Sequence, residues 1–164
     1  MIYTDRLFLK KLSQKDRFFI FKLLNTENWI KYIGDRNIDS VAAAASYIRE
    51  TKQKNKSTLS KIWTVRIKDS NIPIGIITFI KRDYLDFNDI GFAFLPIYSN
   101  KGYAFEATKA VLKKLDVNKV LAITLPQNKR AIKLIEKLGF QLEKIVEQDN
   151  KKLQVYRFKN DNES

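Results

Sequence analysis

The first third of the chain changes from a strand-like stretch to three helical ones. Residues 6–12 are predicted to form a first strand. Ser13 then begins a helix, with Asp16 three residues later in the manner of a capping box, and a strongly apolar segment follows. A short second helix is predicted over residues 25–33. A third is predicted over residues 40–54, where a run of alanines favours helix by intrinsic propensity.

In the middle of the chain, the spacing of apolar residues changes from that of helices to that of strands. Residues 59–67 and 72–81 are rich in Ile, Val, Thr and Phe, which predicts two strands joined by a turn over residues 69–71. A further strand is predicted over residues 89–95, after a polar turn. These three strands can form an antiparallel meander.

The last part of the chain alternates between helices and strands. Residues 103–115 and 128–138 place apolar side chains along one face at helical spacing, so both are predicted as amphipathic helices. Residues 120–125 between them are predicted as a short buried strand. Residues 140–146 and 153–158 are predicted to close the chain as a hairpin.

This order of elements predicts an α/β (α+β) fold of one domain. A meander followed by alternating helices and strands implies a mixed, mostly antiparallel sheet of about seven strands, with helices on both faces. The turn of the last hairpin is expected at Asp149 and Asn150. The domain is expected to span residues 1–160, and residues 161–164 to form a frayed tail.

The absence of two residue types excludes several classes of chemistry. The 164 residues include no cysteine and no histidine. Disulfides, thiolate nucleophiles, histidine-based triads and the common transition-metal sites are therefore excluded, and no metal is expected. No apolar run approaches the roughly 18 residues of a membrane span, and the N-terminus lacks the apolar centre of a signal peptide. The chain is expected to be cytoplasmic.

The chain is strongly basic. It carries 31 Lys and Arg against 18 Asp and Glu, a formal net charge of +13. Such a surface attracts polyanions, which include nucleotide-bearing cofactors, RNA, ribosomes and acidic proteins. The lysines are scattered along the sequence, however, so a composition that mainly keeps the protein soluble is an equal alternative. No sequence pattern of an RNA-binding domain accompanies them.

The most informative segment covers residues 89–108, where an apolar strand passes through a short polar turn directly into a helix. Unpaired N–H groups and the helix dipole make such a helix start suitable for an anion such as a phosphate. Gly102 lets a ligand approach the main chain, and Lys101 adds a positive charge. The turn therefore predicts a phosphate-bearing cofactor. It lacks the Gly-Lys-Ser/Thr order of a nucleotide-hydrolysing phosphate loop.

Three separated segments resemble one known family. Residues 4–10 (TDRLFLK), 89–107 (DIGF…P-x-Y-x-x-KGYA-x-EA) and 128–140 (N-x-x-A-I-x-L…EKLGF) are similar to motifs of the GNAT acetyltransferase superfamily. The likeness is to the branch typified by ribosomal-protein N-terminal acetyltransferases, and it covers nearly the whole chain. That branch often has a glycine at the position of Asn100. Asparagine tolerates positive φ, so the turn can survive the change.

The resemblance implies an N-acetyltransferase that uses acetyl-CoA as donor and a primary amine as acceptor. Backbone N–H groups of the turn would hold the pyrophosphate, and the preceding strand would pair with the pantetheine arm. Asn128 would bind a pantetheine amide, although it can equally act only as the N-cap of its helix. The residues expected to bind the cofactor are Phe94, Leu95, Asn100, Lys101, Gly102, Tyr103, Ala104 and Asn128.

Asp89 is the leading candidate for a general base, because related enzymes often carry a glutamate at this position. An ordinary turn aspartate is the equal alternative, and Asp83 and Asp86 are weaker candidates. Many relatives place a tyrosine on the last helix near the leaving sulfur, where this chain has Ile135. Glu106 lies in the first turn of the cofactor helix and is expected to have a structural role.

The acceptor side is less determined by the sequence. Trp29, Tyr32 and Phe79 are candidates to line the acceptor cleft, although such aromatic residues are more often core residues. The acceptor can be a protein N-terminus or a small amine, and the chain can be a monomer or a homodimer. The alternative function is a module that binds acetyl-CoA, RNA or the ribosome with little or no catalysis. The lysines at 109, 129 and 133 can meet the adenosine phosphate or remain solvated.

Overall fold

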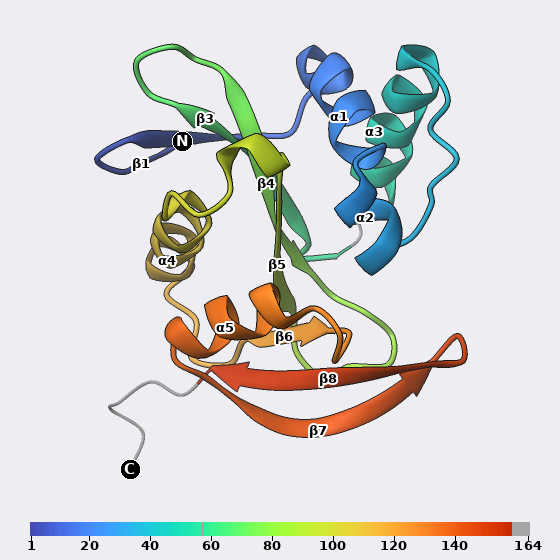
Figure 1. Cartoon of the computed structure of the whole chain (residues 1–164), viewed down its shortest axis with the longest axis vertical. Coiled ribbons are helices and arrows are strands. Elements are labelled where there is room, and N and C mark those ends of the chain that lie inside the picture. Colours follow the sequence, from blue (N-terminus) through green and yellow to red (C-terminus); the bar gives the residue numbers. More distant parts are fainter. Residues whose placement is uncertain (57, 159–164) are drawn as a thin grey trace.

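A computed structural model describes residues 1–56 and 58–158 of the chain (Figure 1). Its strands are β1 (Ile2–Tyr3), β2 (Leu7–Lys11), β3 (Lys61–Ile67), β4 (Pro73–Ile80), β5 (Asp89–Phe94), β6 (Leu121–Thr124), β7 (Phe140–Gln148) and β8 (Lys151–Phe158). Its α-helices are α1 (Arg17–Leu24), α2 (Glu27–Tyr32), α3 (Val41–Asn55), α4 (Tyr103–Leu115) and α5 (Lys129–Lys137). Two short 3₁₀ helices are η1 (Gln14–Asp16) and η2 (Pro96–Tyr98).

The strands form one mixed, mostly antiparallel sheet, which confirms the predicted fold class. Within the described residues the sheet has eight strands in the order β1-β2-β3-β4-β5-β6-β8-β7. The strand beyond the predicted seven is β1, which has two residues and pairs with β2. The predicted tail, residues 161–164, lies outside the described residues.

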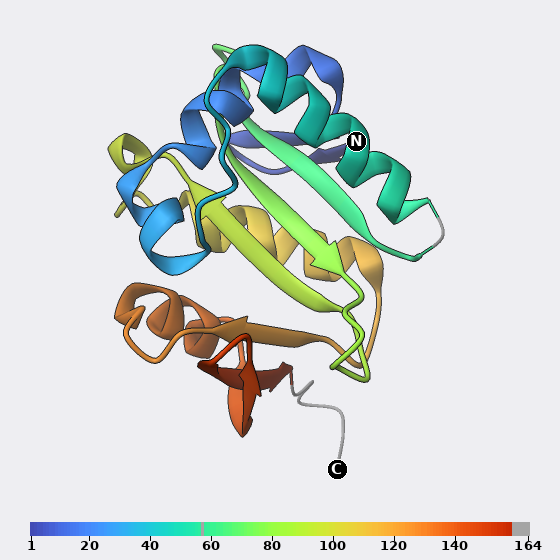
Figure 2. The ribbon, with the colours of Figure 1, turned by 90° about the vertical axis from the view of Figure 1, so that its right-hand side faces the viewer.

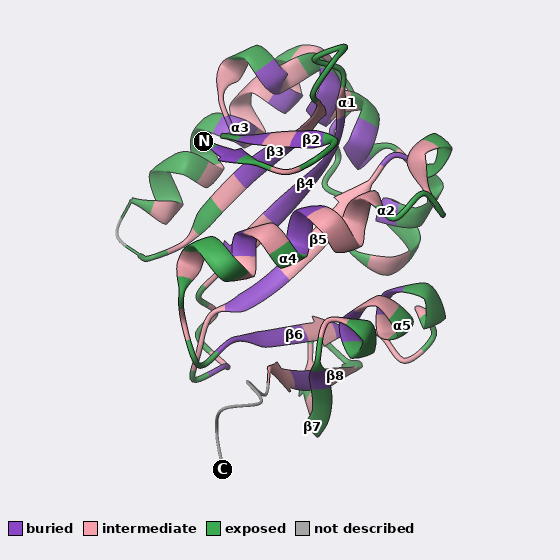
Figure 3. Ribbon diagram, turned by 90° about the vertical axis from the view of Figure 1, so that its left-hand side faces the viewer, coloured by how far each residue is buried: buried purple, intermediate pink, exposed green. Residues whose placement is uncertain are grey.

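Helices cover both faces of this sheet, as the sequence predicts. Helices α1 and α3 lie on one face and α4 lies on the other, which Figures 2 and 3 show from opposite sides. We call the apolar layer under α1 and α3 the α1/α3 core; Ile20, Ile48 and Ile76 belong to it. The layer under α4 and α5 is the α4 core, to which Ile77 and Val111 belong. None of the helices in residues 1–56 and 58–158 has the length and apolar character needed to cross a membrane.

Most helices begin at a residue whose side chain caps them. Ser13 and Asp16 form the predicted capping box at the start of η1, with Asp16 accepting the backbone N–H of Ser13 at 2.9 Å. Thr26, Ser40 and Asn128 each accept a backbone N–H in the first turn of α2, α3 and α5. Helix α4 has no such cap, because Gly102 occupies its N-cap position.

The sheet is continuous, but β5 and β6 pair over a very short length. They are the parallel pair of the sheet, and their register contains one residue pair, Asp89 with Leu121. The two strands lie together where β5 begins and diverge toward its end (Figure 3). Beyond this pairing, one backbone edge of β5 has no strand beside it in the described part of the chain.

The hairpin of β7 and β8 is longer than predicted. Its strands were expected to end at Val146 and to resume at Leu153, but they continue to Gln148 and resume at Lys151. The reason is the turn itself, which is a tight one. Asp149 and Asn150 both have positive φ, 51° and 62°, as the type I′ form of a two-residue hairpin turn requires. The predicted position of this turn is thus the observed one.

A buried carboxylate joins the N-terminal helices to the sheet. Asp16 is 3% exposed, accepts the hydroxyl of Thr64 at 3.0 Å and forms an ion pair with Arg66. It also caps η1 through the N–H of Ser13. The same side chain therefore fixes the start of the helical segment and its place over β3.

We predict that Asp16→Ala lowers the free energy of unfolding by about 3 kcal/mol, because it strands a buried hydroxyl and a guanidinium and removes a cap. Urea denaturation followed by circular dichroism measures the loss. The exposed turn residue Asp69 supplies the matched control, since Asp69→Ala is expected to stay within about 0.5 kcal/mol of the wild type. Equal stability of the two variants would contradict the role given to Asp16.

Candidate functional site

The start of α4 is an uncapped helix end built on two left-handed residues. Asn100 has φ 62° and Gly102 has φ 80°, so the turn folds back before the helix begins. The positive φ of Asn100 confirms that asparagine supports this turn. The first helical backbone bond runs from the N–H of Glu106 to the carbonyl of Gly102, at 3.0 Å. The N–H groups just before Glu106 therefore have no intrahelical partner, which is the arrangement that binds anions.

Arg6 lies across this helix start. Its Nη1 donates to the carbonyl of Lys101 at 2.9 Å, and its guanidinium stacks on the ring of Tyr103 at 4.3 Å. Its Nε and Nη2 contact Oε2 of Glu106 at 2.8 and 2.7 Å. A Cβ added at Gly102 would lie 3.4 Å from Nη2. In the sequence, Arg6 is part of the motif over residues 4–10, and no local pattern indicates this contact.

Glu106 is the acceptor that holds the N-terminal segment against α4. The hydroxyl of Thr4 donates to its Oε1 at 2.6 Å, and the backbone N–H of Arg6 donates to the same oxygen at 3.0 Å. Burial by itself would raise the pKa of Glu106, but the hydrogen bonds from Thr4 and Arg6 and the charge of Arg6 outweigh it and lower that pKa. Glu106 is therefore held as a carboxylate, and its contacts give it a structural role.

Aromatic and cationic side chains surround the same turn. The rings of Tyr98 and Tyr103 meet edge to face with centroids 6.5 Å apart, and Nζ of Lys101 lies 6.0 Å from the ring of Tyr98. Lys101 and Gly102 are exposed, whereas Tyr103 and Ala104 are partly covered. The turn thus presents positive charge around backbone donors, and its role as a phosphate site stays a prediction.

The unpaired edge of β5 continues from this turn. Leu95 has both backbone groups occupied, since its N–H donates to Ile74 at 2.9 Å and its carbonyl accepts from Tyr98 at 3.0 Å. Backbone groups of successive strand residues point to alternate edges. Because the carbonyl of Asn88 accepts from Leu121 of β6, those of Phe92 and Phe94 face the same side. Phe92, which the sequence analysis did not single out, therefore shares the open edge with Phe94, and Leu95 does not.

Asn128 stands at the start of α5. Its Oδ1 accepts the N–H of Ala131 at 3.3 Å, so it does cap the helix. Its Nδ2 makes no hydrogen bond with any part of the chain that the structure describes, and remains available to a ligand. Lys129 and Lys133 are exposed on α5, and Nζ of Lys109 lies 5.5 Å from the ring of Phe105. Ile135 is buried in the α4 core, so this position offers no proton donor.

Asp89 lies at the point where β5 and β6 meet. It is 2% exposed, and its Oδ2 accepts from Nε of Arg82 at 2.7 Å. Burial raises the pKa of Asp89, while the charge and hydrogen bond of Arg82 oppose the rise without cancelling it. The carboxylate is thus both the member of a buried ion pair and an acid shifted toward the range of a general base. Asp83 and Asp86 are exposed on the preceding turn.

The three residues predicted for the acceptor cleft do not lie together. Trp29 belongs to the α1/α3 core and Phe79 to the α4 core, so the sheet separates them. Trp29 is packed in the same layer as Leu95, and its indole N–H has no partner among the described residues. Tyr32 is half-buried at the end of α2, with Nζ of Lys31 5.1 Å from its ring.

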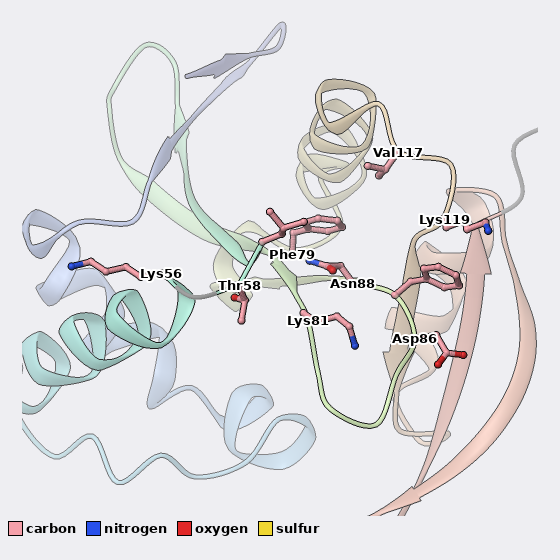
Figure 4. A pocket seen from close by; sticks show the side chains of 10 residues that line it. Lys56, Thr58, Phe79, Lys81, Asp86, Asn88, Val117 and Lys119 are labelled. Atoms are coloured by element: carbon pink, nitrogen blue, oxygen red, sulfur yellow. The ribbon is translucent and has the colours of Figure 1, made fainter.

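Phe79 instead lines an open pocket at the opposite end of β5 from the turn. Figure 4 shows this pocket of about 680 Å³, with Phe79, Lys81, Asp86 and Asn88 among its walls. Nζ of Lys81 donates to the backbone carbonyls of Arg82 and Leu85. Because Asn88 precedes β5 and the turn follows it, the pocket is separate from the start of α4. Within the described residues, no group of three or more acidic side chains is placed to hold a metal ion.

Comparisons with known proteins identify the family of this chain. The sequence profile of the acetyltransferase (GNAT) domain matches residues 6–141. The uncharacterized N-acetyltransferase YnaD of Bacillus subtilis is 29% identical over 146 residues, which cover 87% of this chain and 83% of that protein.

Solved structures of acetyltransferases share the fold. The microcin C7 self-immunity acetyltransferase MccE, solved with acetyl-CoA and AMP, superposes with a TM-score of 0.81 at 18% identity, over 96% of this chain and 94% of that one. The ribosomal-protein-S5-alanine acetyltransferase of Vibrio fischeri gives a TM-score of 0.78 at 16% identity, over 99% and 97%. The chain belongs to the GNAT family of acetyltransferases, enzymes that transfer the acetyl group of acetyl-CoA to an amine.

Proposed function

We propose that this enzyme binds acetyl-CoA between the start of α4 and the open edge of β5, and transfers the acetyl group directly to the α-amine of a peptide. The observation that carries the proposal is the uncapped start of α4, which follows β5, a strand inside the sheet that pairs with its neighbour β6 through one residue pair among the described residues. A helix end of this kind can bind an anion, and the neighbouring strand has free backbone donors. The two together suit a ligand in which a diphosphate is joined to a chain of amides.

The residues of the turn fit such a ligand. Backbone N–H groups from Asn100 to Ala104 would hold the diphosphate, and the side chain of Lys101 would add a positive charge. Gly102 leaves the main chain uncovered at this point. Phe94, together with Phe92, would donate and accept backbone hydrogen bonds along the pantetheine, and Nδ2 of Asn128 would reach it from α5.

Asp89 is our candidate for the group that takes the proton from the amine. Its raised pKa brings it closer to the operating pH than an exposed aspartate. Asp89 lies where β5 and β6 are still paired, at the point from which the two strands diverge. The contact with Arg82 involves Oδ2, so Oδ1 is the oxygen that would accept the proton, directly or through water.

Two arguments favour an α-amine over a polyamine as acceptor. The first is local charge: Arg82 offsets Asp89, and the neighbouring Asp86 shares its pocket with Lys81 and Lys119, so the overall positive charge is not reversed here. The second is protonation. At pH 7 about a tenth of an α-amine is neutral, against about one part in 2,500 of a lysine-like amine. A single carboxylate as base therefore suits the more acidic amine.

An acceptor panel tests the proposal through the release of coenzyme A thiol. We expect kcat/KM for a short acidic peptide with a free N-terminus to exceed that for spermidine by about 10-fold or more, because the basic surface attracts the peptide and repels the polycation. The same peptide with a blocked N-terminus and an internal lysine serves as control and should not react. Binding of acetyl-CoA without turnover of any amine would contradict the proposal and indicate that the protein is a binding module.

Gly102→Glu should abolish binding of acetyl-CoA, since it places a bulky anion where the diphosphate would lie and forces a side chain into left-handed φ. Isothermal titration calorimetry measures the loss. The matched control is Gly102→Ala, which introduces the backbone strain alone and is expected to weaken binding by about 10-fold at most. Micromolar affinity retained by the glutamate variant would place the cofactor elsewhere.

Asp89→Asn should lower kcat by about 100-fold while the Kd for acetyl-CoA changes less than about 3-fold, because the variant loses a proton acceptor and keeps the shape of the side chain. The wild-type rate should rise with pH as the carboxyl, whose pKa is raised, loses its proton, and the variant should lack this limb. Asp83→Asn, at an exposed position, is the control. Unchanged turnover with a lowered melting temperature would make Asp89 a purely structural residue.

A further inference from the structure

The anion site proposed at the start of α4 contains a carboxylate that should oppose it. Glu106 lies in the first turn of α4, where a negative charge compensates the helix dipole. It thereby weakens the positive potential that would otherwise attract an anion. Its lowered pKa keeps it ionised at neutral pH. A diphosphate held by the same turn would therefore meet a like charge close by unless that charge is neutralised.

Arg6 supplies the neutralising charge, and it does so from a distant part of the sequence. Two of its nitrogens contact Oε2 of Glu106, at 2.8 and 2.7 Å, which is the geometry of a strong charge-assisted pair. The remaining contacts of its guanidinium are with the turn itself, at the carbonyl of Lys101 and the ring of Tyr103. The Arg6 side chain remains nearly half exposed, so it faces the solvent side where a ligand would approach.

We propose that Arg6 is a positioning residue for the cofactor: it cancels the charge of Glu106 at the start of α4 and holds the carbonyl of Lys101, so that the turn keeps its N–H groups directed at an anion. This inference depends on the proposed function, because it concerns the same turn. It assigns to Arg6 an effect on acetyl-CoA affinity that acts through Glu106 and Lys101.

The competing explanation is that Arg6 and Glu106 only fasten the N-terminal segment to the domain. Thr4 and the backbone of Arg6 also bind Glu106, so loss of the carboxylate would loosen that segment at least as much as loss of the guanidinium. The two explanations therefore predict different effects on acetyl-CoA binding when Glu106 is removed. A fastening role predicts that removal of Glu106 weakens binding, whereas charge cancellation predicts that it does not.

A double-mutant cycle of charge-neutralising variants, measured by calorimetry, separates them. Acetyl-CoA is titrated into the wild type, Arg6→Gln, Glu106→Gln, the double variant and Arg6→Lys, at low and at high salt, with melting temperatures recorded in parallel. Arg49→Gln is the control for net charge, because Arg49 is exposed on α3, on the other face of the sheet.

We expect Arg6→Gln to weaken binding by about 10-fold at low salt and by less at high salt, since salt then partly screens the carboxylate of Glu106 that Arg6 no longer neutralises. Glu106→Gln should bind within about 3-fold of the wild type, the double variant should recover most of the loss, and Arg6→Lys should be intermediate. Arg49→Gln should bind as the wild type does.

Three results would overturn the inference while leaving the proposed function intact: wild-type affinity in Arg6→Gln, binding by Glu106→Gln that is weakened as much as in Arg6→Gln, or a double variant that binds as weakly as Arg6→Gln alone. If the wild-type chain binds no acetyl-CoA, the proposed function fails, and the role given to Arg6 fails with it.

Discussion

The short pairing between β5 and β6 is the constraint on which the rest of the site depends. One residue pair, Asp89 with Leu121, holds the two halves of the sheet together before the strands diverge. The divergence leaves donors and acceptors of β5 without a strand partner among residues 1–56 and 58–158, and an unpaired edge of this kind is normally covered or blunted. Here the strand is followed by η2 and the uncapped start of α4, and in the proposed function this backbone would form the surface for a ligand that carries both amides and phosphates.

Pairs of opposite charge fix the elements around this surface. Asp16 holds the helical segment to β3, Asp89 joins its strand to the preceding turn through Arg82, and Glu106 ties the N-terminal segment to α4. Each of these carboxylates is matched by an arginine, whereas the excess lysines lie mostly on the surface. The basic character of the chain is thus divided between arginines that organise the fold and lysines that set the surrounding field.

Much of the fold could be predicted because local patterns carry it. The helix over residues 103–115 has the predicted bounds, and the capping box at Ser13 and the hairpin turn at Asp149 were visible as residue types at fixed spacing. Strand β1 was missed because two residues are too few to show a period. The extension of β7 and β8 was missed because polar residues beside a tight turn resemble a longer loop.

The sequence by itself determined the family and the donor substrate and predicted an anion site at the turn, because these depend on local motifs and on main-chain geometry near Gly102. Only the tertiary structure decided which residues meet. It brought Arg6 onto Glu106 across 100 residues, occupied both backbone groups of Leu95, and placed Trp29 and Phe79 on opposite faces of the sheet. Contacts between distant segments follow from register and packing, which no local pattern encodes.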